Sequence, residues 1–492
     1  MANEKKKKYT RLELMAEAPV RGAIIKLAIP TILSQIMSLV YSMVSTYCLG
    51  HMGEAASAQV AAVTLATPVT MVIQAVGNIF ATGASPFISR HLGAGDIKTA
   101  RRASSTAFWT AGGLSVLTVL LFFIIREPVL RLIGTNAETY QSTKEYLTII
   151  TGFSFMQVLS TACSGTVRSE GGTKESMIGM GGGGIVNAIL TPLFIFSFGW
   201  GIKGAAWAQV GAHFYTLGYF VSVFVRGRST LSINPKDFKP SLEIYWSIIK
   251  FGIPSALSNV LMSLTGIMGN RMAGTFGTHV IAAQGVVGRI SMIAYMMNFG
   301  FCLGYQPFCT YNYGARNFQR MKEAFKVSII YSTSIGIVIG LLLLIIPQQL
   351  VGIFVDDPEV IAAATIIARW LALAIPFTGS QNTFMYTAQA LDKPVRAMLI
   401  TLGRQILYVP FLYLLSNAFG LTGFAAVQPC CDILITAIGA AIILPVFRRV
   451  LRDGLTEKEA RDVKEDVEAV EAAAELADAA EAAEEAAENK AE

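Results

Sequence analysis

Long apolar runs recur along the whole chain, and they constrain its fold more than any other feature. Of the 492 residues, 53% are hydrophobic and only 15% are charged. A helix that crosses the hydrocarbon core of a bilayer needs about 20 consecutive apolar residues. The runs therefore predict an all-α membrane protein with twelve transmembrane helices. We expect these spans at residues 23–49, 56–87, 103–125, 142–167, 175–199, 204–225, 246–273, 280–310, 324–346, 361–388, 395–417 and 422–447.

Lys and Arg residues gather in the loops of one side. Four lysines, Lys5 to Lys8, precede the first span, and loops of the same side carry pairs such as Arg101 and Arg102. The opposite loops carry few basic residues. By the positive-inside rule the basic side is cytoplasmic. An even number of spans then predicts a multi-pass protein of the plasma membrane with both termini cytoplasmic. We expect no cleaved signal peptide.

The two halves of the chain resemble each other. KLAIPTILSQ, from Lys26, matches KFGIPSALSN, from Lys250, at a separation of 224 residues. GASPFISRHLGAGD, from Gly83, matches GYQPFCTYNYGARN, from Gly304, at a separation of 221. The matches predict two parallel repeats of a six-helix unit around a central cavity. Such repeats are typical of transporters that bind substrate between their halves.

The repeat also predicts the domain organisation. We expect a cytoplasmic N-terminal segment (1–22), an N-lobe with helices 1–6 (23–226), a cytoplasmic linker (227–243), a C-lobe with helices 7–12 (244–447) and a cytoplasmic tail (448–492). The tail is acidic and rich in Ala and Glu, with almost no apolar stripe to bury. We expect a solvated, partly helical appendage; contact with the basic cytoplasmic loops is the alternative.

Motifs of other protein classes are missing. The chain has no HExxH, GxSxG or P-loop motif and no paired carboxylates within a span, so we expect no enzyme. No filter motif suggests a channel. GMGGGG, Gly179 to Gly184, lacks the Gly-Lys-Ser/Thr of a phosphate loop and instead predicts close helix packing. The six cysteines form no CxxC, so we expect packing residues, without metal, disulfide or cofactor.

Several stretches together resemble the multidrug and toxic compound extrusion (MATE) family. They are LVYSMVSTYCLGHMG, TVRSEGGTKESM, NAILTPLFIFSFGWGIKGAAWAQV, GYQPFCTYNYGARNFQRMKEA and QALDKPVRAMLITLGRQ, and the resemblance covers about residues 12–450. It implies a two-lobe exporter of amphipathic and cationic drugs that exchanges them for H⁺ or Na⁺. The partners to expect are then an amphipathic small molecule, the coupling ion and membrane lipids. We expect a monomer and no nucleic acid.

The first helix carries a stripe of uncharged polar residues, Ser38, Ser42 and Ser45, on one face. Family members often carry Asp where this chain has Ser45, and Asp in an N-x-x-x-D-P pattern where it has Thr191, four residues after Asn187. The resemblance thus implies an N-lobe pathway of Ser38, Ser42, Ser45, Asn187, Thr191, Gln209 and His213 that lacks the family's two acids. Serine and threonine do not titrate, so the usual ion switch is missing. Alternatively, the serines only bond to helix carbonyls.

Ionisable groups inside spans are functional candidates by default. Coupling is expected to use protons through His213 or Asp432; a structural ion pair between Arg404 and Asp432 is the alternative. In the C-lobe we predict a substrate and ion pathway of Arg289, Met292, Tyr295, Asn298, Arg404 and Asp432. Methionine and aromatic faces suit varied flat amphipaths. An uncoupled facilitator and a flippase of a lipid-linked precursor are the alternative functions.

Overall fold

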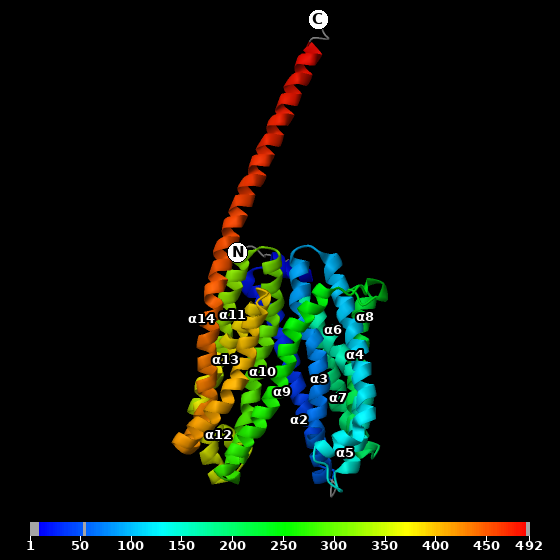
Figure 1. Cartoon of the computed structure of the whole chain (residues 1–492), viewed down its shortest axis with the longest axis vertical. Coiled ribbons are helices and arrows are strands. Elements are labelled where there is room, and N and C mark those ends of the chain that lie inside the picture. The colour runs from blue at the N-terminus through cyan, green and yellow to red at the C-terminus, as the bar shows by residue number, and fades with distance from the viewer. Residues whose placement is uncertain (1–8, 53–55, 489–492) are drawn as a thin grey trace, which may run out of the picture.

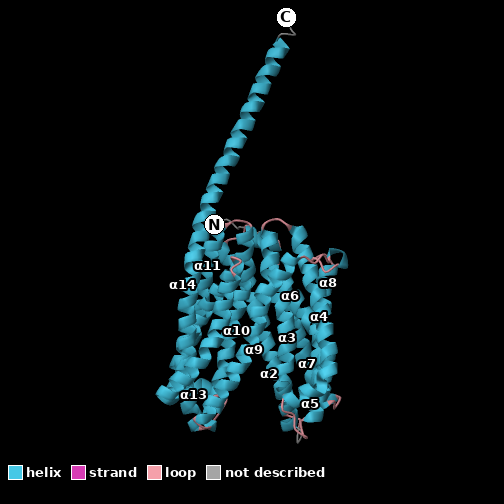
Figure 2. Ribbon diagram, in the orientation of Figure 1, coloured by secondary structure: helices cyan, strands magenta, loops and turns pink. Residues whose placement is uncertain are grey.

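The computed structural model describes residues 9–52 and 56–488. Their regular secondary structure is entirely helical (Figure 2). Long helices run side by side, and both ends of the described chain lie on the same side of the bundle (Figure 1). We call this side the terminal face and the opposite side the open face.

The helices follow one another with short connections. Their bounds are α1 (Arg11–Ala16), α2 (Val20–Gly50), α3 (Ala56–Gly93), α4 (Ile97–Leu132), α5 (Tyr140–Gly152), α6 (Ser154–Ser169), α7 (Thr173–Pro192), the π-helical turn η2 (Leu193–Ser197), α8 (Gly201–Val225), the 3-10 turn η3 (Pro235–Asp237), α9 (Leu242–Thr275), α10 (Thr278–Gly314), α11 (Phe318–Ile345), α12 (Pro347–Gly352), α13 (Pro358–Ala390) and α14 (Pro394–Glu488).

Helices occupy all twelve of the predicted ranges. By length and apolar composition, nine helices of the described residues qualify as membrane spans, or ten if the bent pair α5 and α6 is one span. The last two predicted spans both lie in α14, which breaks at Gly420, where φ is 60° and ψ is −138°. The helix α8 covers the range 204–225 but is not among the spans that qualify.

Two predicted elements differ in detail. The range 142–167 is not one straight helix, because α5 and α6 meet at a bend of 49°. Gly152, a poor helix former, ends α5 at the bend. The tail is helical throughout its described length rather than in part: α14 continues without a loop to Glu488 and projects from the terminal face (Figure 1). Its Ala- and Glu-rich composition favours helix over loop.

Glycines bring the lobes together near the terminal face. A Cβ added at Gly93 would lie 2.0 Å from the Tyr311 carbonyl oxygen, and one added at Gly314 would lie 2.0 Å from the Arg90 carbonyl oxygen. These two glycines are matching positions of the sequence repeat. At this face, therefore, the end of α3 packs directly on the backbone of α10, and the end of α10 packs directly on the backbone of α3.

A second level of the same seam lies deeper in the bundle. A Cβ at Gly83 of α3 would meet the Ile248 carbonyl oxygen at 2.3 Å, and one at Gly304 of α10 would meet the Ala28 Cα at 2.6 Å. Gly83 and Gly304 also match in the repeat. Equivalent glycines thus make equivalent contacts between α3 and α9 and between α10 and α2, which agrees with two parallel repeats related by an approximate two-fold axis.

Charged residues add to the seam at the terminal face. Asp392, in the turn before α14, pairs with Arg90 of α3 at 3.0 Å and with Lys250 of α9 at 2.5 Å. Burial acts to raise the pKa of Asp392, but the bonds to Lys250 and Arg90 outweigh it and hold that pKa below its ordinary value. The carboxylate therefore stays charged and joins the two lobes.

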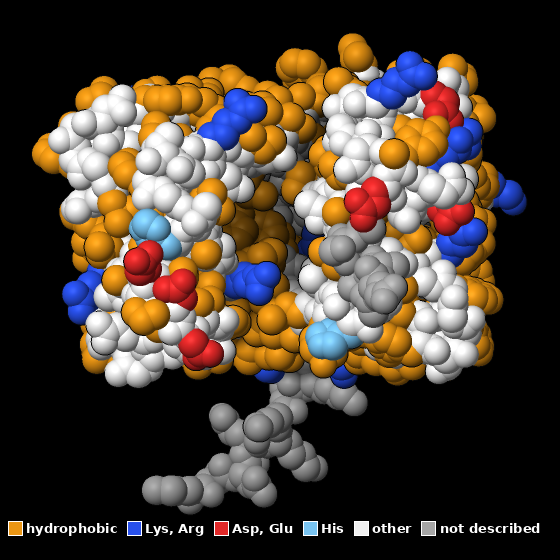
Figure 3. All heavy atoms as spheres, turned by 90° about the horizontal axis from the view of Figure 1, so that it is seen from below, with side chains coloured by type: hydrophobic (Ala, Val, Ile, Leu, Met, Phe, Trp, Pro, Cys, Tyr) orange, Lys and Arg blue, Asp and Glu red, His pale blue; other side chains and the backbone are white. Residues whose placement is uncertain are grey.

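The opposite end of the bundle is hollowed. Seen from the open face, the molecule has a central depression between its two halves, with hydrophobic side chains on its walls (Figure 3). The ribbons of the two halves diverge toward this face (Figure 1). The described structure is thus closed at the terminal face and open at the other.

Candidate substrate and ion pathway

A buried ion pair lies inside the C-lobe. The Arg404 Nε atom is 2.6 Å from Asp432 Oδ1, and the Asp432 side chain is fully buried, while that of Arg404 is 21% exposed. The two residues lie on opposite sides of the break at Gly420. Few charges occur inside the spans, and a buried charge is tolerated only when it is paired. The structure thus contains the ion pair between Arg404 and Asp432 that the sequence analysis named as the alternative.

The pair leaves one acceptor unused. The second oxygen of the carboxylate, Asp432 Oδ2, is buried and has no partner of good hydrogen-bond geometry among the described residues, although the side chain of Gln428 lies close to the carboxylate. A buried carboxylate oxygen without a donor is costly. Asp432 can therefore take one further proton or cation on this side without breaking a hydrogen bond at Oδ2.

The middle of α10 passes beside this pair. Tyr295 lies close enough to interact electrostatically with both Arg404 and Asp432, and its ring stacks on Phe299 with centroids 5.7 Å apart. Asn298 is fully buried, yet neither its amide nitrogen nor its oxygen has a partner among the described residues. Met292 is 44% exposed, and Arg289 is exposed as well. Asn298 is thus buried and Tyr295 half-buried, whereas Arg289 and Met292 are exposed.

The serine stripe of α2 makes mainly local bonds. Ser38 donates to the Ser34 carbonyl at 3.0 Å, as a helix-bonding serine does. Ser42 is exposed and Ser45 is half-buried. The Ser38 hydroxyl therefore bonds to a carbonyl of its own helix, as in the alternative interpretation of the stripe.

Polar residues on α7 pair with each other. Thr191 and Asn187 are both buried, and the Thr191 hydroxyl donates to Asn187 Oδ1 at 3.2 Å. The Thr191 hydroxyl is therefore used in a bond within α7, and this position offers no charged group. The predicted packing role of the glycines upstream is confirmed. A Cβ at Gly184 would lie 3.0 Å from the Tyr41 ring of α2, and one at Gly183 would lie 2.1 Å from the Thr216 hydroxyl of α8.

Gln209 and His213 lie one turn apart on α8, but they bond to different elements. Tyr146 of α5 donates its hydroxyl to Gln209 Oε1 at 3.2 Å. Ser160 of α6 donates to the His213 carbonyl at 3.4 Å, and the ring atom His213 Nε2 is buried without a partner among the described residues. The structure therefore places His213 in the N-lobe interior without joining it to Gln209.

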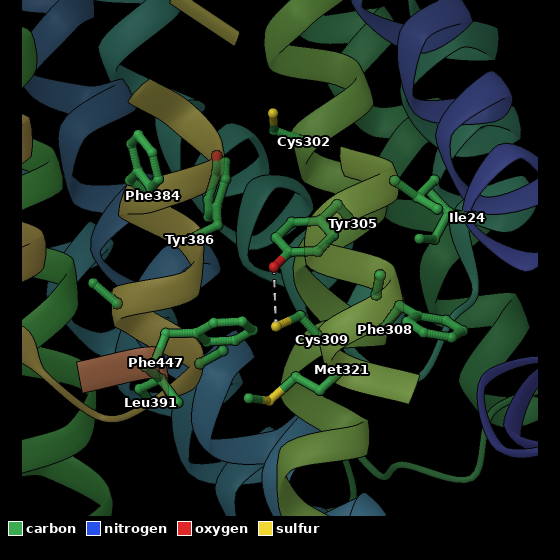
Figure 4. Packing of buried hydrophobic residues seen from close by; sticks show 14 of the residues in the cluster. Ile24, Cys302, Tyr305, Phe308, Cys309, Met321, Phe384, Tyr386, Leu391 and Phe447 are labelled. Atoms are coloured by element: carbon green, nitrogen blue, oxygen red, sulfur yellow. Dashed lines mark hydrogen bonds between the residues drawn. The ribbon is translucent and has the colours of Figure 1, made fainter. Parts of the chain in front are cut away.

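Sequence reasoning missed a polar chain between α10, α11 and α13. Tyr305, which is fully buried, shares a 2.8 Å hydrogen bond with Thr387 and donates to the Cys309 sulfur at 3.2 Å (Figure 4). Gln306 donates to Gln389 at 2.7 Å. Thr383 and Thr387 are spaced four residues apart on α13, a spacing that could have indicated one polar face.

These features define a class of protein. Two bundles of long apolar helices meet at one face, diverge at the other and enclose polar groups at mid-depth. This is the architecture of a two-lobe membrane transporter.

The MatE family model matches residues 30–193 and 254–414, and the chain therefore belongs to the MATE family of transporters. It is a multi-pass membrane protein with the MATE fold, and it is not an enzyme. The two matched segments lie one in each half of the chain.

The chain is similar to proteins of known name along almost its whole length. It is 27% identical over 449 residues to multidrug export protein MepA of Staphylococcus aureus (strain MSSA476), covering 91% of this chain and 98% of the relative. MepA of Staphylococcus saprophyticus is 26% identical over 453 residues, covering 92% of this chain and 99% of the relative.

Solved structures match the fold. One, described as the outward-facing conformation of a multidrug resistance MATE family transporter of the MOP superfamily, aligns with a TM-score of 0.85 and 22% identity, covering 91% of this chain and 100% of that chain. A MOP superfamily transporter from Pyrococcus furiosus aligns with a TM-score of 0.84 and 22% identity, covering 90% and 99%.

Proposed function

We propose that this chain exports amphipathic and cationic small molecules from the cell by alternating access between the N-lobe and the C-lobe. The Staphylococcus relatives described above are multidrug exporters, and both cover nearly this whole chain. The loops at the terminal face carry most of the Lys and Arg residues, which supports a cytoplasmic terminal face in the plasma membrane. In this orientation the described structure is the outward-facing state. We further propose that it works as a monomer.

The coupling ion in this proposal is H⁺, and Asp432 carries it. One observation supports this most: a fully buried carboxylate that pairs with Arg404 at 2.6 Å and keeps a second oxygen with no donor of good geometry among the described residues. A cationic substrate and a proton would compete for that oxygen. Protonation of Asp432 from the outside would remove the site for the cation and weaken the pair with Arg404. Antiport follows, because one carboxylate cannot hold both.

The substrate surface in this proposal lies on α10 beside the ion pair. Tyr295 and Phe299 offer stacked aromatic faces, and Met292 offers an adaptable apolar side chain. The buried amide of Asn298 would bond to a polar group of the substrate. Flat amphipathic cations fit such a surface, since aromatic faces attract both their rings and their charge.

Two residues of the N-lobe support a second candidate function, that of an uncoupled facilitator. Ser45 and Thr191 stand where many relatives of the family carry acids, and Thr191 bonds to Asn187. In the main proposal, the N-lobe set lines the pathway with neutral polar groups and does not bind the coupling ion. His213 is then a packing residue.

Efflux from proteoliposomes tests the two functions. Ethidium efflux would be followed with ΔpH and Na⁺ gradients imposed separately, for wild type, Asp432→Asn and His213→Ala. We expect ΔpH alone to drive efflux in wild type and His213→Ala, and not in Asp432→Asn. Equilibration independent of both gradients would instead support the facilitator. Folded Asp432→Asn protein with undiminished ΔpH-driven efflux would contradict the assigned proton site, and failure of this variant to fold would favour a structural ion pair.

A further inference from the structure

The short helix α1 precedes the first span and lies against the seam between the lobes. Its start is fixed by a capping box, in which Thr10 accepts a bond from the Glu13 backbone and Glu13 accepts one from the Thr10 backbone at 2.8 Å. A six-residue helix is not stable alone, so α1 depends on what it contacts. Those contacts belong to both halves of the molecule.

One end of α1 binds the N-lobe. Arg11 pairs with Glu170, in the turn between α6 and α7, and with Glu175 of α7 at 2.8 Å. Glu170 is almost fully buried and also accepts bonds from the backbone and the hydroxyl of Thr230 at 2.8 and 2.7 Å. The carboxylate that receives Arg11 is therefore held in place by the linker.

The other end of α1 binds the C-lobe. The Met15 carbonyl accepts bonds from the side chains of Asn312 and Arg320, each at 3.2 Å, and Arg320 also donates to the Ala18 carbonyl at 2.6 Å. The Met15 side chain is fully buried, in one apolar cluster with Phe308 and Met321. Figure 4 shows these two residues within that cluster.

The anchors lie in different lobes. Glu170 and Glu175 belong to the N-lobe, while Asn312 and Arg320 belong to the C-lobe. Only a few residues of chain separate Arg11 from Met15, so the two sets of contacts can coexist only while the lobes meet at the terminal face. Separation of the lobes must break one set.

We propose that residues 10–18 form a latch that holds the cytoplasmic face closed and must be released before the transporter opens inward. The latch rests on the proposed alternating access but not on the substrate or the coupling ion. Opening requires loss of either the two Arg11 ion pairs or the Met15 and Ala18 contacts. The latch thus adds to the glycine seam and biases the protein toward the outward-facing state.

Distances between spin labels test the latch. Lys98, before the third predicted span, and Lys322 of α11 are exposed at the terminal face of the N-lobe and the C-lobe, respectively. Both would be changed to Cys and labelled in a background without the six native cysteines. Pulsed EPR would then report the open fraction for wild type, Arg11→Ala, Arg11→Lys and a deletion of residues 2–16.

We expect Arg11→Ala to raise the ratio of long to short distances about tenfold, equivalent to about 1.4 kcal/mol. The deletion should raise it further, and Arg11→Lys should restore most of the closed fraction. Arg21→Ala is the matched control, because Arg21 is exposed on α2 and takes no part in the described ion pairs. In Arg11→Ala the buried Glu170 carboxylate keeps its two bonds from Thr230, so we expect this variant to fold even if the deletion does not.

Unchanged distances in folded Arg11→Ala protein would overturn the proposal, as would an equal rise in Arg21→Ala. The EPR distances are measured without substrate and without an ion gradient. A failed efflux experiment would therefore leave the latch standing, and a failed latch would leave the exporter standing.

Discussion

The glycine seam makes a quantitative prediction about conformational balance. In Gly93→Ala, the new Cβ would lie 2.0 Å from the Tyr311 carbonyl oxygen and 2.9 Å from the Ala315 nitrogen. Both are backbone atoms, so no side chain can rotate away. Ordinary van der Waals contact begins at 3.4 Å, and the lobes must therefore move apart by about 1.4 Å at this point.

Overpacking of this kind costs about 1–3 kcal/mol. The cost falls on the closed terminal face alone, because the clash is between lobes. The ratio of protein closed at the terminal face to protein open there should therefore fall by about 5-fold to 150-fold. Gly314→Ala, the equivalent change in the other repeat, should have a similar effect, since its Cβ would lie 2.0 Å from the Arg90 carbonyl oxygen.

Pulsed EPR between labels at positions 98 and 322 measures this ratio directly. Gly218→Ala in α8 is the control, because a Cβ at Gly218 meets nothing within 4 Å. It makes the same chemical change, in a helix interior and without a clash. If Gly93→Ala and Gly314→Ala kept the wild-type distances, the seam would not decide which face is closed.

Two further predictions use the charged and polar groups. Because the folded-state pKa of Asp392 lies below its ordinary value, its pairs with Arg90 and Lys250 stabilise the closed face above about pH 4 and are lost as the pH falls through the lower, folded-state pKa. Distances in wild type should lengthen at low pH, and Asp392→Asn should show long distances at neutral pH with little further change on acidification. Asn298→Leu should raise thermal stability by about 1 kcal/mol, since it removes a buried amide that has no partner in the described part of the chain. The same variant should slow ethidium efflux; slowed unfolding with unchanged efflux would exclude Asn298 from the substrate surface.

The sequence predicted the helices well because their signal is local. Each span carries enough apolar residues by itself, and the repeat pairs Gly83 with Gly304 and Gly93 with Gly314 before any contact is known. The rarity of charge inside the spans pointed to Arg404 and Asp432, since such groups must find each other.

Features that depend on tertiary contacts were harder to predict. The capping pattern of Thr10 and Glu13 can be read from sequence, but the burial of Met15 between the lobes cannot. Nor does the spacing of Ser38 reveal whether its hydroxyl faces a cavity or its own helix. The Ala- and Glu-rich composition predicted helix in the tail, but composition alone did not specify that this helix continues from the last span.

Proton release on substrate binding tests the central claim most directly. Ethidium would be added to purified protein in weakly buffered detergent solution, at a series of pH values down to the range in which substrate-free Asp432 is protonated, and the released protons would be measured for wild type and Asp432→Asn. If one carboxylate holds either a proton or the substrate cation, wild type should release up to about one proton per bound ethidium, and Asp432→Asn none. Equal release from both proteins, or binding to wild type without release, would contradict exchange at Asp432.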